Sequence, residues 1–309
     1  MPHVADTSVR SPVLPSNAER TSNAPGGDAP VPDDSRPLTI IGPPAMSVMT
    51  LVRALGRLRQ YRDLLYTLSH HRLQVRYKQS ILGWLWAIVQ PLSLMLIYTV
   101  IFSRVARVET GSPYPLFAYS ALLVWSCFST AVGTATNSLV SHFNLVTKVY
   151  FPREILPLSY VIAALADLLA GGIVLAALLV YYQIPLTIYA LYSLPAVAVL
   201  MLFALAVSLV LCAVQVRYRD IGIAMPLLPQ LWMFATPVVY PLFKVPAPWR
   251  PLYLLNPMAG VVETFRQALV EGRAPDVAPL AIATAVTVLV LPLAFLYFKK
   301  VEANVADIL

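Results

Sequence analysis

Charged residues are scarce in this chain. Asp, Glu, Lys and Arg together make up 12% of its 309 residues, whereas 58% of the residues are hydrophobic. An ordinary soluble domain carries about a quarter of its residues charged. The few charges also gather in short segments between long, almost uncharged stretches, which is typical of a chain that alternates between hydrocarbon and water. The composition excludes an ordinary soluble domain and predicts an integral membrane protein.

Cysteine is nearly absent as well. Cys127 and Cys212 both lie in apolar runs, where a free cysteine behaves as a small buried hydrophobic side chain. Their spacing suggests neither a disulfide framework nor a metal site. No nucleophile–base pair, metal-ligand cluster or carboxylate pair gathers at one membrane face, and His70 and His71 point in different directions on a helix. We therefore expect no catalytic residue, no metal and no cofactor on this chain.

The net charge is +7. The basic residues cluster beside apolar runs instead of forming a continuous stripe on a soluble domain, so membrane lipids with anionic headgroups or an anionic substrate are the predicted partners, and nucleic acid is not. Residues 1–47 are rich in Pro, Ser, Asn, Asp and Gly, which predicts a disordered cytoplasmic tail. Residues 48–83 are expected to form a cytoplasmic amphipathic segment, followed by a transmembrane domain over residues 84–309.

Six runs of about twenty apolar residues are long enough to cross a membrane as helices. They are Trp84–Ser103, Pro115–Thr136, Leu156–Tyr182, Leu191–Val214, Ile221–Tyr240 and Val277–Phe298. The predicted fold class is therefore all-α integral membrane, with six transmembrane helices per subunit. If the N-terminus is inside, thirteen Lys and Arg residues near the spans fall on the inner side and six on the outer side, which predicts that both termini are cytoplasmic.

The fifth run is rich in proline, with Pro226, Pro229, Pro237 and Pro241 in or beside it. A helix with so many prolines is kinked or broken, and exposed backbone groups are tolerated in a membrane where they line a cavity. This pattern favours a pore-lining segment, although proline is also more common in spanning helices in general.

Two shorter segments are amphipathic. The first, Tyr61–Lys78, is expected to lie on the inner membrane surface as an N-terminal interface helix. The second, Asn256–Val270, can begin with Asn256 as its N-cap and is expected to form a short re-entrant or capping helix at the outer face. Its apolar residues share one face, which places Glu263 and Arg266 on the solvent side.

Five motifs occur in a recognisable order. They are RYKQSILGWLWAIVQPLSLMLIYTVIF at Arg76–Phe102, KVYFPREILPLS at Lys148–Ser159, VRYRDIG at Val216–Gly222, TPVVYP at Thr236–Pro241 and LNPMAGVVETFRQALVEG at Leu255–Gly272. Over about residues 50–300, the chain resembles the membrane subunit of ABC-2 type polysaccharide exporters, which move O-antigen, capsule or teichoic-acid chains out of bacteria. The tail before residue 48 is not part of this pattern.

The resemblance implies a multi-pass permease subunit of the bacterial inner membrane. Two copies of such a subunit pair with two copies of a separate ABC ATPase subunit, which would hold ATP and Mg²⁺, and this chain indeed has no G-x-x-x-x-G-K-[ST] phosphate loop. The expected substrate is a lipid-linked polysaccharide, with O-antigen first and capsule next. An ABC-2 exporter of a small molecule or lipid, a membrane glycosyltransferase or polymerase, and a secondary transporter are the alternatives.

The candidate site residues fall into four groups. The loop after the second span is expected to dock on the ATPase, or else to tuck under the helix bundle; its residues are Phe143, Val146, Tyr150, Phe151, Arg153 and Glu154. A basic group would guide the substrate's diphosphate into the entrance, or only bind anionic lipid; it comprises Arg72, Arg76 and Lys78. Aromatic residues would line the channel, or only pack helices; they are Tyr98, Phe102, Trp232, Phe234 and Tyr240. The outer gate is expected at Asn256, Glu263, Phe265 and Arg266.

Asp167 is an acidic residue placed well inside a predicted span. An ionisable group within the membrane is a functional candidate. Gly171 and Gly172 follow one turn later, where close helix packing could bury a hydrogen-bonded Asp. We interpret Asp167 as a structural residue.

Overall fold

The computed structural model describes residues 56, 59–78, 83–105, 107 and 110–308, and the regular structure in this part is helical. The predicted tail over residues 1–47 lies outside the described residues. In chain order the elements are α2 (Arg62–Tyr77), η1 (Gly83–Leu85), α3 (Trp86–Tyr98), η2 (Thr99–Val105), α4 (Tyr114–Thr136), α5 (Ser138–Ser141), α6 (Phe143–Lys148), α7 (Ile155–Tyr181), η3 (Ile188–Tyr192), α8 (Ser193–Arg217), α9 (Asp220–Ala224), α10 (Leu228–Phe234), η4 (Leu242–Lys244), η5 (Ala247–Trp249), α11 (Arg250–Leu254), α12 (Pro257–Leu269) and α13 (Val277–Ile308).

Five helical stretches among the described residues are long and apolar enough to cross a membrane. They are Trp86–Ser103, Tyr114–Thr136, Ile155–Tyr181, Ile188–Arg217 and Val277–Glu302. Each agrees within a few residues with one of the predicted spans. The all-helical membrane fold is confirmed at this level.

The remaining predicted span, Ile221–Tyr240, is not one continuous helix. Its residues form the short helices α9 and α10, which are separated by a turn around Pro226. Beyond α10 the chain continues without regular helix through Pro237 and Pro241. A proline lacks the N–H that an α-helix needs and its ring clashes with the preceding turn. The predicted break at these prolines is therefore found.

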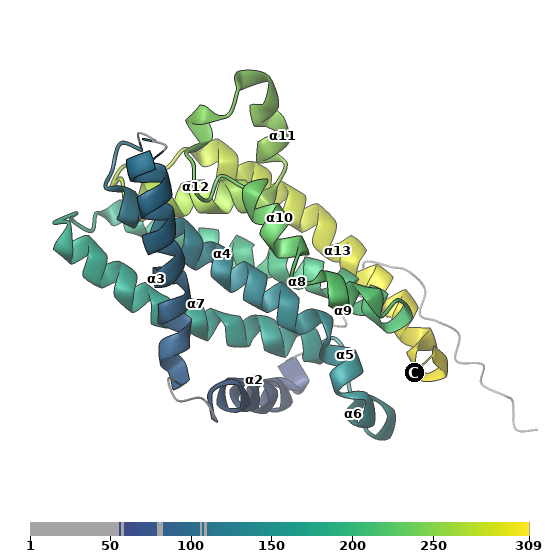
Figure 1. The fold of residues 1–309 in the computed structure, drawn as a ribbon. Coiled ribbons are helices and arrows are strands. Elements are labelled where there is room, and N and C mark those ends of the chain that lie inside the picture. Colours follow the sequence, from purple (N-terminus) through teal and green to yellow (C-terminus); the bar gives the residue numbers. More distant parts are fainter. Residues whose placement is uncertain (1–55, 57–58, 79–82, 106, 108–109, 309) are drawn as a thin grey trace, which may run out of the picture. The chain divides into compact units, whose positions relative to one another are not determined.

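Helix α4 is the centre of the bundle. It packs against α7, α8, α3 and α12, and α8 in turn packs along α13 (Figure 1). Large aromatic side chains of α4, among them Phe117, Tyr119 and Phe128, are fully buried. The hydroxyl of Tyr119 donates a hydrogen bond of 3.0 Å to the carbonyl oxygen of Gly171 on α7. Cys127 is buried and free in the same core, as the sequence predicts.

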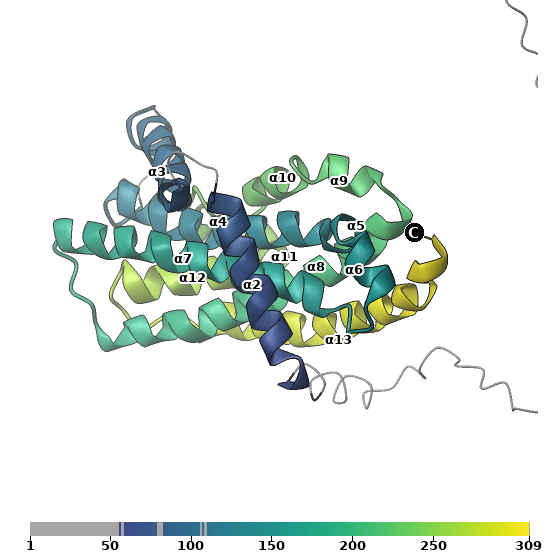
Figure 2. The ribbon, with the colours of Figure 1, turned by 90° about the horizontal axis from the view of Figure 1, so that it is seen from below.

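A second core cluster lies around the loop that follows α4. It joins Leu139, Phe151, Ile155 and Phe298 from α5, the loop, α7 and α13. Three partly buried leucines of α2 pack against it: Leu64, Leu65 and Leu68. The predicted amphipathic helix is therefore present as α2, and it crosses the side of the bundle beside α7 (Figure 2).

Helix α12 approaches the start of α13 very closely at Gly260. A Cβ atom added to Gly260 would lie 2.2 Å from the carbonyl oxygen of Pro279, a distance that backbone atoms cannot accept. The absence of a side chain at this position lets the two helices meet, as small residues do in membrane bundles.

Replacing Gly260 with alanine should therefore destabilise the protein. We expect the Gly260→Ala substitution to lower the free energy of unfolding by about 1–3 kcal/mol, the usual range for overpacking, and to lower the melting temperature in detergent. Gly172→Ala is the matched control, because a Cβ at this helical glycine meets nothing within 4 Å. Equal melting temperatures for the two variants would contradict the close approach.

Candidate functional site

A cavity of about 590 Å³ opens between α3, α4 and the broken segment α9–α10. We call it the polar groove. Its lining residues are Gln90, Leu94, Tyr98, Leu122, Trp125, Ser126, Ser129, Thr130, Gly133, Thr134, Asn137, Gly222, Met225, Pro226, Pro229, Gln230 and Met233. Hydroxyl and amide groups are frequent in this set, and none of these lining residues carries a charge.

One stripe of α4 supplies most of the polar groups in the groove. Ser126, Ser129, Thr130, Thr134 and Asn137 recur at spacings of three and four residues, so they share one face of the helix. They are partly or fully exposed, whereas the remainder of α4 is mostly buried. The stripe was not among the predicted site residues, although its helical period is visible in the sequence.

The predicted channel aromatics are dispersed in the structure. Of the five, Tyr98 borders the polar groove. Phe102 stacks on the ring of Tyr114 with a centroid distance of 6.2 Å. Trp232 meets the rings of Phe128 and Phe203 edge-on at 5.2 and 5.9 Å. These contacts agree better with helix packing for Phe102 and Trp232, the alternative that the sequence left open.

The other two predicted channel aromatics lie on the surface and in a loop. The side chain of Phe234 is about half exposed at the end of α10. The hydroxyl of Tyr240 donates a hydrogen bond of 2.8 Å to the carbonyl oxygen of Phe234 and lies 3.3 Å from the hydroxyl of Tyr253. Tyr240 therefore fastens the loop that follows α10.

The segment from residue 137 to residue 154 connects α4 to α7, and we call it the elbow. Tyr150 is 93% exposed at its tip, and Phe143 and Val149 are also exposed. Val146 and Phe151 are instead buried in the second core cluster. Of these predicted docking residues, Phe143 and Tyr150 are exposed, whereas Val146 and Phe151 are not available to a partner in this conformation.

Arg153 and Glu154 join the elbow to α13. The Nζ of Lys299 lies 2.6 Å from the Oε2 of Glu154, which is 3% exposed, and 2.6 Å from the Oε2 of Glu302. Arg153 donates a hydrogen bond of 2.9 Å to the carbonyl oxygen of Glu302. In this conformation the two predicted docking residues hold the start of α7 against the end of α13.

Arg72 joins α2 to the elbow. Its guanidinium group contacts the imidazole of His142 and lies over the ring of Tyr160, 4.3 Å from its centroid. Burial lowers the pKa of His142, the hydrogen bond to the carbonyl oxygen of Ser138 partly opposes this, and the neighbouring charge of Arg72 lowers the pKa further. The net shift favours the neutral imidazole, which can accept a hydrogen bond. Lys78 is exposed at the end of α2, and the side chain of Arg76 lies outside the described residues.

Arg266 is buried at the other end of α4, contrary to the predicted solvent side of α12. Its side chain is 1% exposed and lies over the ring of Phe117, 3.6 Å from the centroid. The Nη2 donates to the carbonyl oxygens of Pro237 and Val238 at 3.2 and 3.0 Å. The prediction was wrong because the loop after α10 folds over α12 and covers this part of it.

The remaining outer-gate residues, Asn256, Glu263 and Phe265, have structural contacts. Glu263 is 14% exposed and accepts a hydrogen bond of 2.8 Å from the side chain of Gln267. Asn256 caps α12, since its Oδ1 accepts a hydrogen bond from the backbone N–H of Met258 at 3.2 Å, as the sequence predicts. Its Nδ2 donates to the hydroxyl of Thr236 at 2.8 Å. Phe265 is buried in the main core.

The match to a known family covers all of these features except α13. The model of the ABC-2 type transporter family matches residues 63–270, from α2 through the elbow and the polar groove to the end of α12. This chain belongs to the ABC-2 type transporter family. The family membership suggested by the five sequence motifs is confirmed.

Several relatives of this ABC-2 type transporter carry the name O-antigen export system permease protein RfbA. The one from Myxococcus xanthus is 35% identical over 261 residues, which is 83% of this chain and 99% of the relative. One from Klebsiella pneumoniae is 28% identical over 68% of this chain and 81% of the relative. The polysialic acid transport protein KpsM of Escherichia coli is 23% identical over 65% and 78%.

The contribution of the Glu154–Lys299 ion pair to the stability of this ABC-2 chain can be tested by substitution. Replacing Glu154 with Gln would leave the side chain of Lys299, which is 13% exposed, with one carboxylate fewer. Removing one partner of a buried pair costs about 3–5 kcal/mol; Glu302 remains, so we expect the lower end of that range and a clear drop in melting temperature. Asp63→Asn, at an exposed acid, is the control and should leave the melting temperature unchanged. If Glu154→Gln is as stable as that control, the pair does not hold the elbow.

Proposed function

We propose that this chain is the permease subunit of an ATP-driven exporter that moves a lipid-linked cell-surface polysaccharide across the bacterial inner membrane, with O-antigen as the first candidate and capsule polysaccharide as the second. The names of the relatives support this assignment. The polar groove is the observation that carries it. A glycan has many neutral hydroxyl groups, which can exchange hydrogen bonds along a row of hydroxyl and amide side chains.

The groove also lacks features that would arrest such a chain. No charged side chain is among its lining residues, so a neutral sugar meets no strong ionic partner. The rings of Tyr98 and Trp125 border it and offer flat apolar surfaces to the C–H faces of sugars. These properties allow weak, repeated contacts, which a translocating polymer needs.

In our proposal two copies of the chain complete the path. The span formed by α3 and η2 is poorly covered within one chain: Leu96 and Ile97 are exposed on α3, and Val100 and Ile101 on η2. A second copy would cover part of this surface and close the groove. The broken segment α9–α10 would serve as the sixth crossing, since discontinuous helices are tolerated where they line a cavity. Both termini would be cytoplasmic.

Two copies of an ABC ATPase subunit, which hold ATP and Mg²⁺, would supply the energy at the elbow. The exposed side chains of Phe143, Val149 and Tyr150 form an apolar surface at its tip, and exposed aromatic residues are frequent anchors in protein interfaces. A movement of the elbow would reach α13 through the Glu154–Lys299 pair. It would reach α2 through the contact of Arg72 with His142.

Docking at the elbow can be tested with Tyr150→Ala. Because Tyr150 is 93% exposed, we expect a normal fold and a roughly tenfold lower recovery of the co-expressed ATPase subunit on a tagged permease. Tyr181→Ala is the matched control, since Tyr181 is also exposed but lies at the opposite end of α7. Undiminished recovery with Tyr150→Ala would contradict docking here, and no ATPase on the unaltered permease would refute the exporter itself.

Passage through the polar groove can be tested by filling it. A phenylalanine at Ser129 would project from the polar stripe of α4 into the cavity, so we expect Ser129→Phe to abolish surface polysaccharide in a strain that lacks its own copy. Leu169→Phe, on an exposed face of α7, should support normal export. Immunoblots would verify equal amounts of both proteins in the membrane. Normal export by Ser129→Phe would place the path elsewhere.

A further inference from the structure

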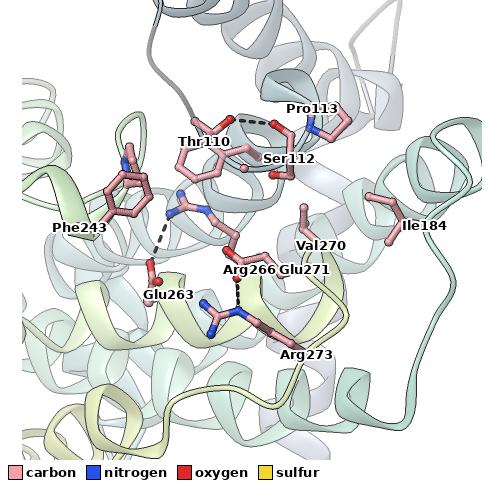
Figure 3. A pocket seen from close by; sticks show the side chains of 13 residues that line it. Thr110, Ser112, Pro113, Ile184, Phe243, Glu263, Arg266, Val270, Glu271 and Arg273 are labelled. Atoms are coloured by element: carbon pink, nitrogen blue, oxygen red, sulfur yellow. Dashed lines mark hydrogen bonds and ion pairs between the residues drawn. The ribbon is translucent and has the colours of Figure 1, made fainter.

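A separate cavity of about 440 Å³ lies at the start of α4, the end away from the elbow. We call it the outer pocket. Helix α12 supplies Glu263 and Arg266 to its wall, and Glu271 and Arg273 follow in the next loop. Figure 3 shows the ion pair of Arg266 with Glu263 and that of Arg273 with Glu271 among the lining side chains. The polar groove and the outer pocket have no lining residue in common.

Arg266 has unused hydrogen-bonding capacity in this pocket. Its side chain is 1% exposed, yet its Nε and Nη1 have no hydrogen-bond acceptor within the part of the chain that the structure describes. The carboxylate of Glu263 is 3.5 Å from Nη1, which balances charge without a hydrogen bond. Buried donors without partners are rare in native proteins because each one costs stability. The wall of the pocket therefore contains two hydrogen-bond donors, the Nε and Nη1 of Arg266, that acceptor oxygens of a ligand can satisfy.

Ser112 adds a third unpartnered group to the same wall. Its hydroxyl oxygen is buried and has no hydrogen-bond partner among the described residues, while its carbonyl oxygen accepts a hydrogen bond of 2.8 Å from the hydroxyl of Thr110. A serine hydroxyl can both donate and accept. A ligand that fits here must therefore offer hydrogen-bond acceptors to Arg266, and either a donor or an acceptor to the hydroxyl of Ser112.

The charges of the pocket favour a neutral ligand. Two arginines and two glutamates line it, so a phosphate or carboxylate that approached Arg266 would also face Glu263 and Glu271. Neighbouring hydroxyl groups on a sugar ring can bind both the positive and the negative side chains, because they accept hydrogen bonds from guanidinium groups and donate them to carboxylates. The exposed ring of Phe243 at the rim can cover the apolar face of the sugar.

We propose that the outer pocket is a binding subsite for one neutral glycosyl residue of the exported polymer. The inference rests on the proposed polysaccharide export, because it identifies the ligand as a sugar of the substrate. The pocket would hold the chain after it leaves the membrane path. It would thereby oppose backward slippage between ATPase cycles.

Binding can be measured with the full chain in lipid nanodiscs by saturation-transfer NMR, with methyl α-D-mannopyranoside as the neutral probe and inorganic phosphate as the competitor. We expect saturation of the probe on the unaltered protein and about tenfold weaker binding by Phe243→Ala and Glu271→Gln, since each loses one stacking or hydrogen-bonding partner. Both residues lie at the rim, so the fold should persist. Trp249→Ala, at another exposed aromatic residue outside this pocket, should bind normally.

Three results would overturn the subsite: no saturation of the probe, equal binding by all variants, or displacement of the probe by phosphate. The first would mean that the pocket holds only water, and the last that it is an anion site. Recovery of the ATPase subunit on the unaltered permease separates these failures from failure of the proposed function. If the permease recovers the ATPase but fails to bind the probe, the subsite is rejected and the proposed function stands.

Discussion

The structure depends on one constraint, which is that polar groups in a membrane must find their partners inside the protein. Helix α4 shows how the chain meets it. Most of this helix is buried against α3, α7, α8 and α12, and its hydroxyl-bearing face turns toward the polar groove. The proline-broken segment α9–α10 lines the same groove, and irregular backbone is tolerated within a membrane where it borders a cavity. One arrangement thus satisfies both the polar stripe of α4 and the broken helix beside it.

Charged residues follow the same constraint at the two ends of α4. At the elbow, Lys299 lies between Glu154 and Glu302, and Arg72 lies against His142 and Tyr160. These contacts connect the loop to the first and last described helices. A push on the elbow would therefore move several helices together, because the buried charges cannot separate without a large cost in free energy.

Arg266, near the start of α4, is another buried charged residue. It is buried against Phe117 and two backbone carbonyl groups, but its Nε and Nη1 have no hydrogen-bond partner in the part of the chain that the structure describes. Among the described residues the Nε of Arg72 and the Oε1 of Glu154 at the elbow also have no hydrogen-bond partner, but of these three charged side chains Arg266 is the one that lines the outer pocket.

The sequence by itself determined the membrane class, five of the spanning helices, the segments that form α2 and α12, the break at the prolines, the Asn256 cap and the family. These depend on composition and on short-range patterns of apolar residues, prolines and capping groups, which act along the chain. Only the tertiary structure decided which charges are buried and which aromatic residues face a cavity. Arg266 was placed on the solvent side because helical spacing describes one helix alone, whereas the loop that covers Arg266 comes from about thirty residues earlier in the chain. The helical repeat of a single segment does not predict such contacts with distant parts of the chain.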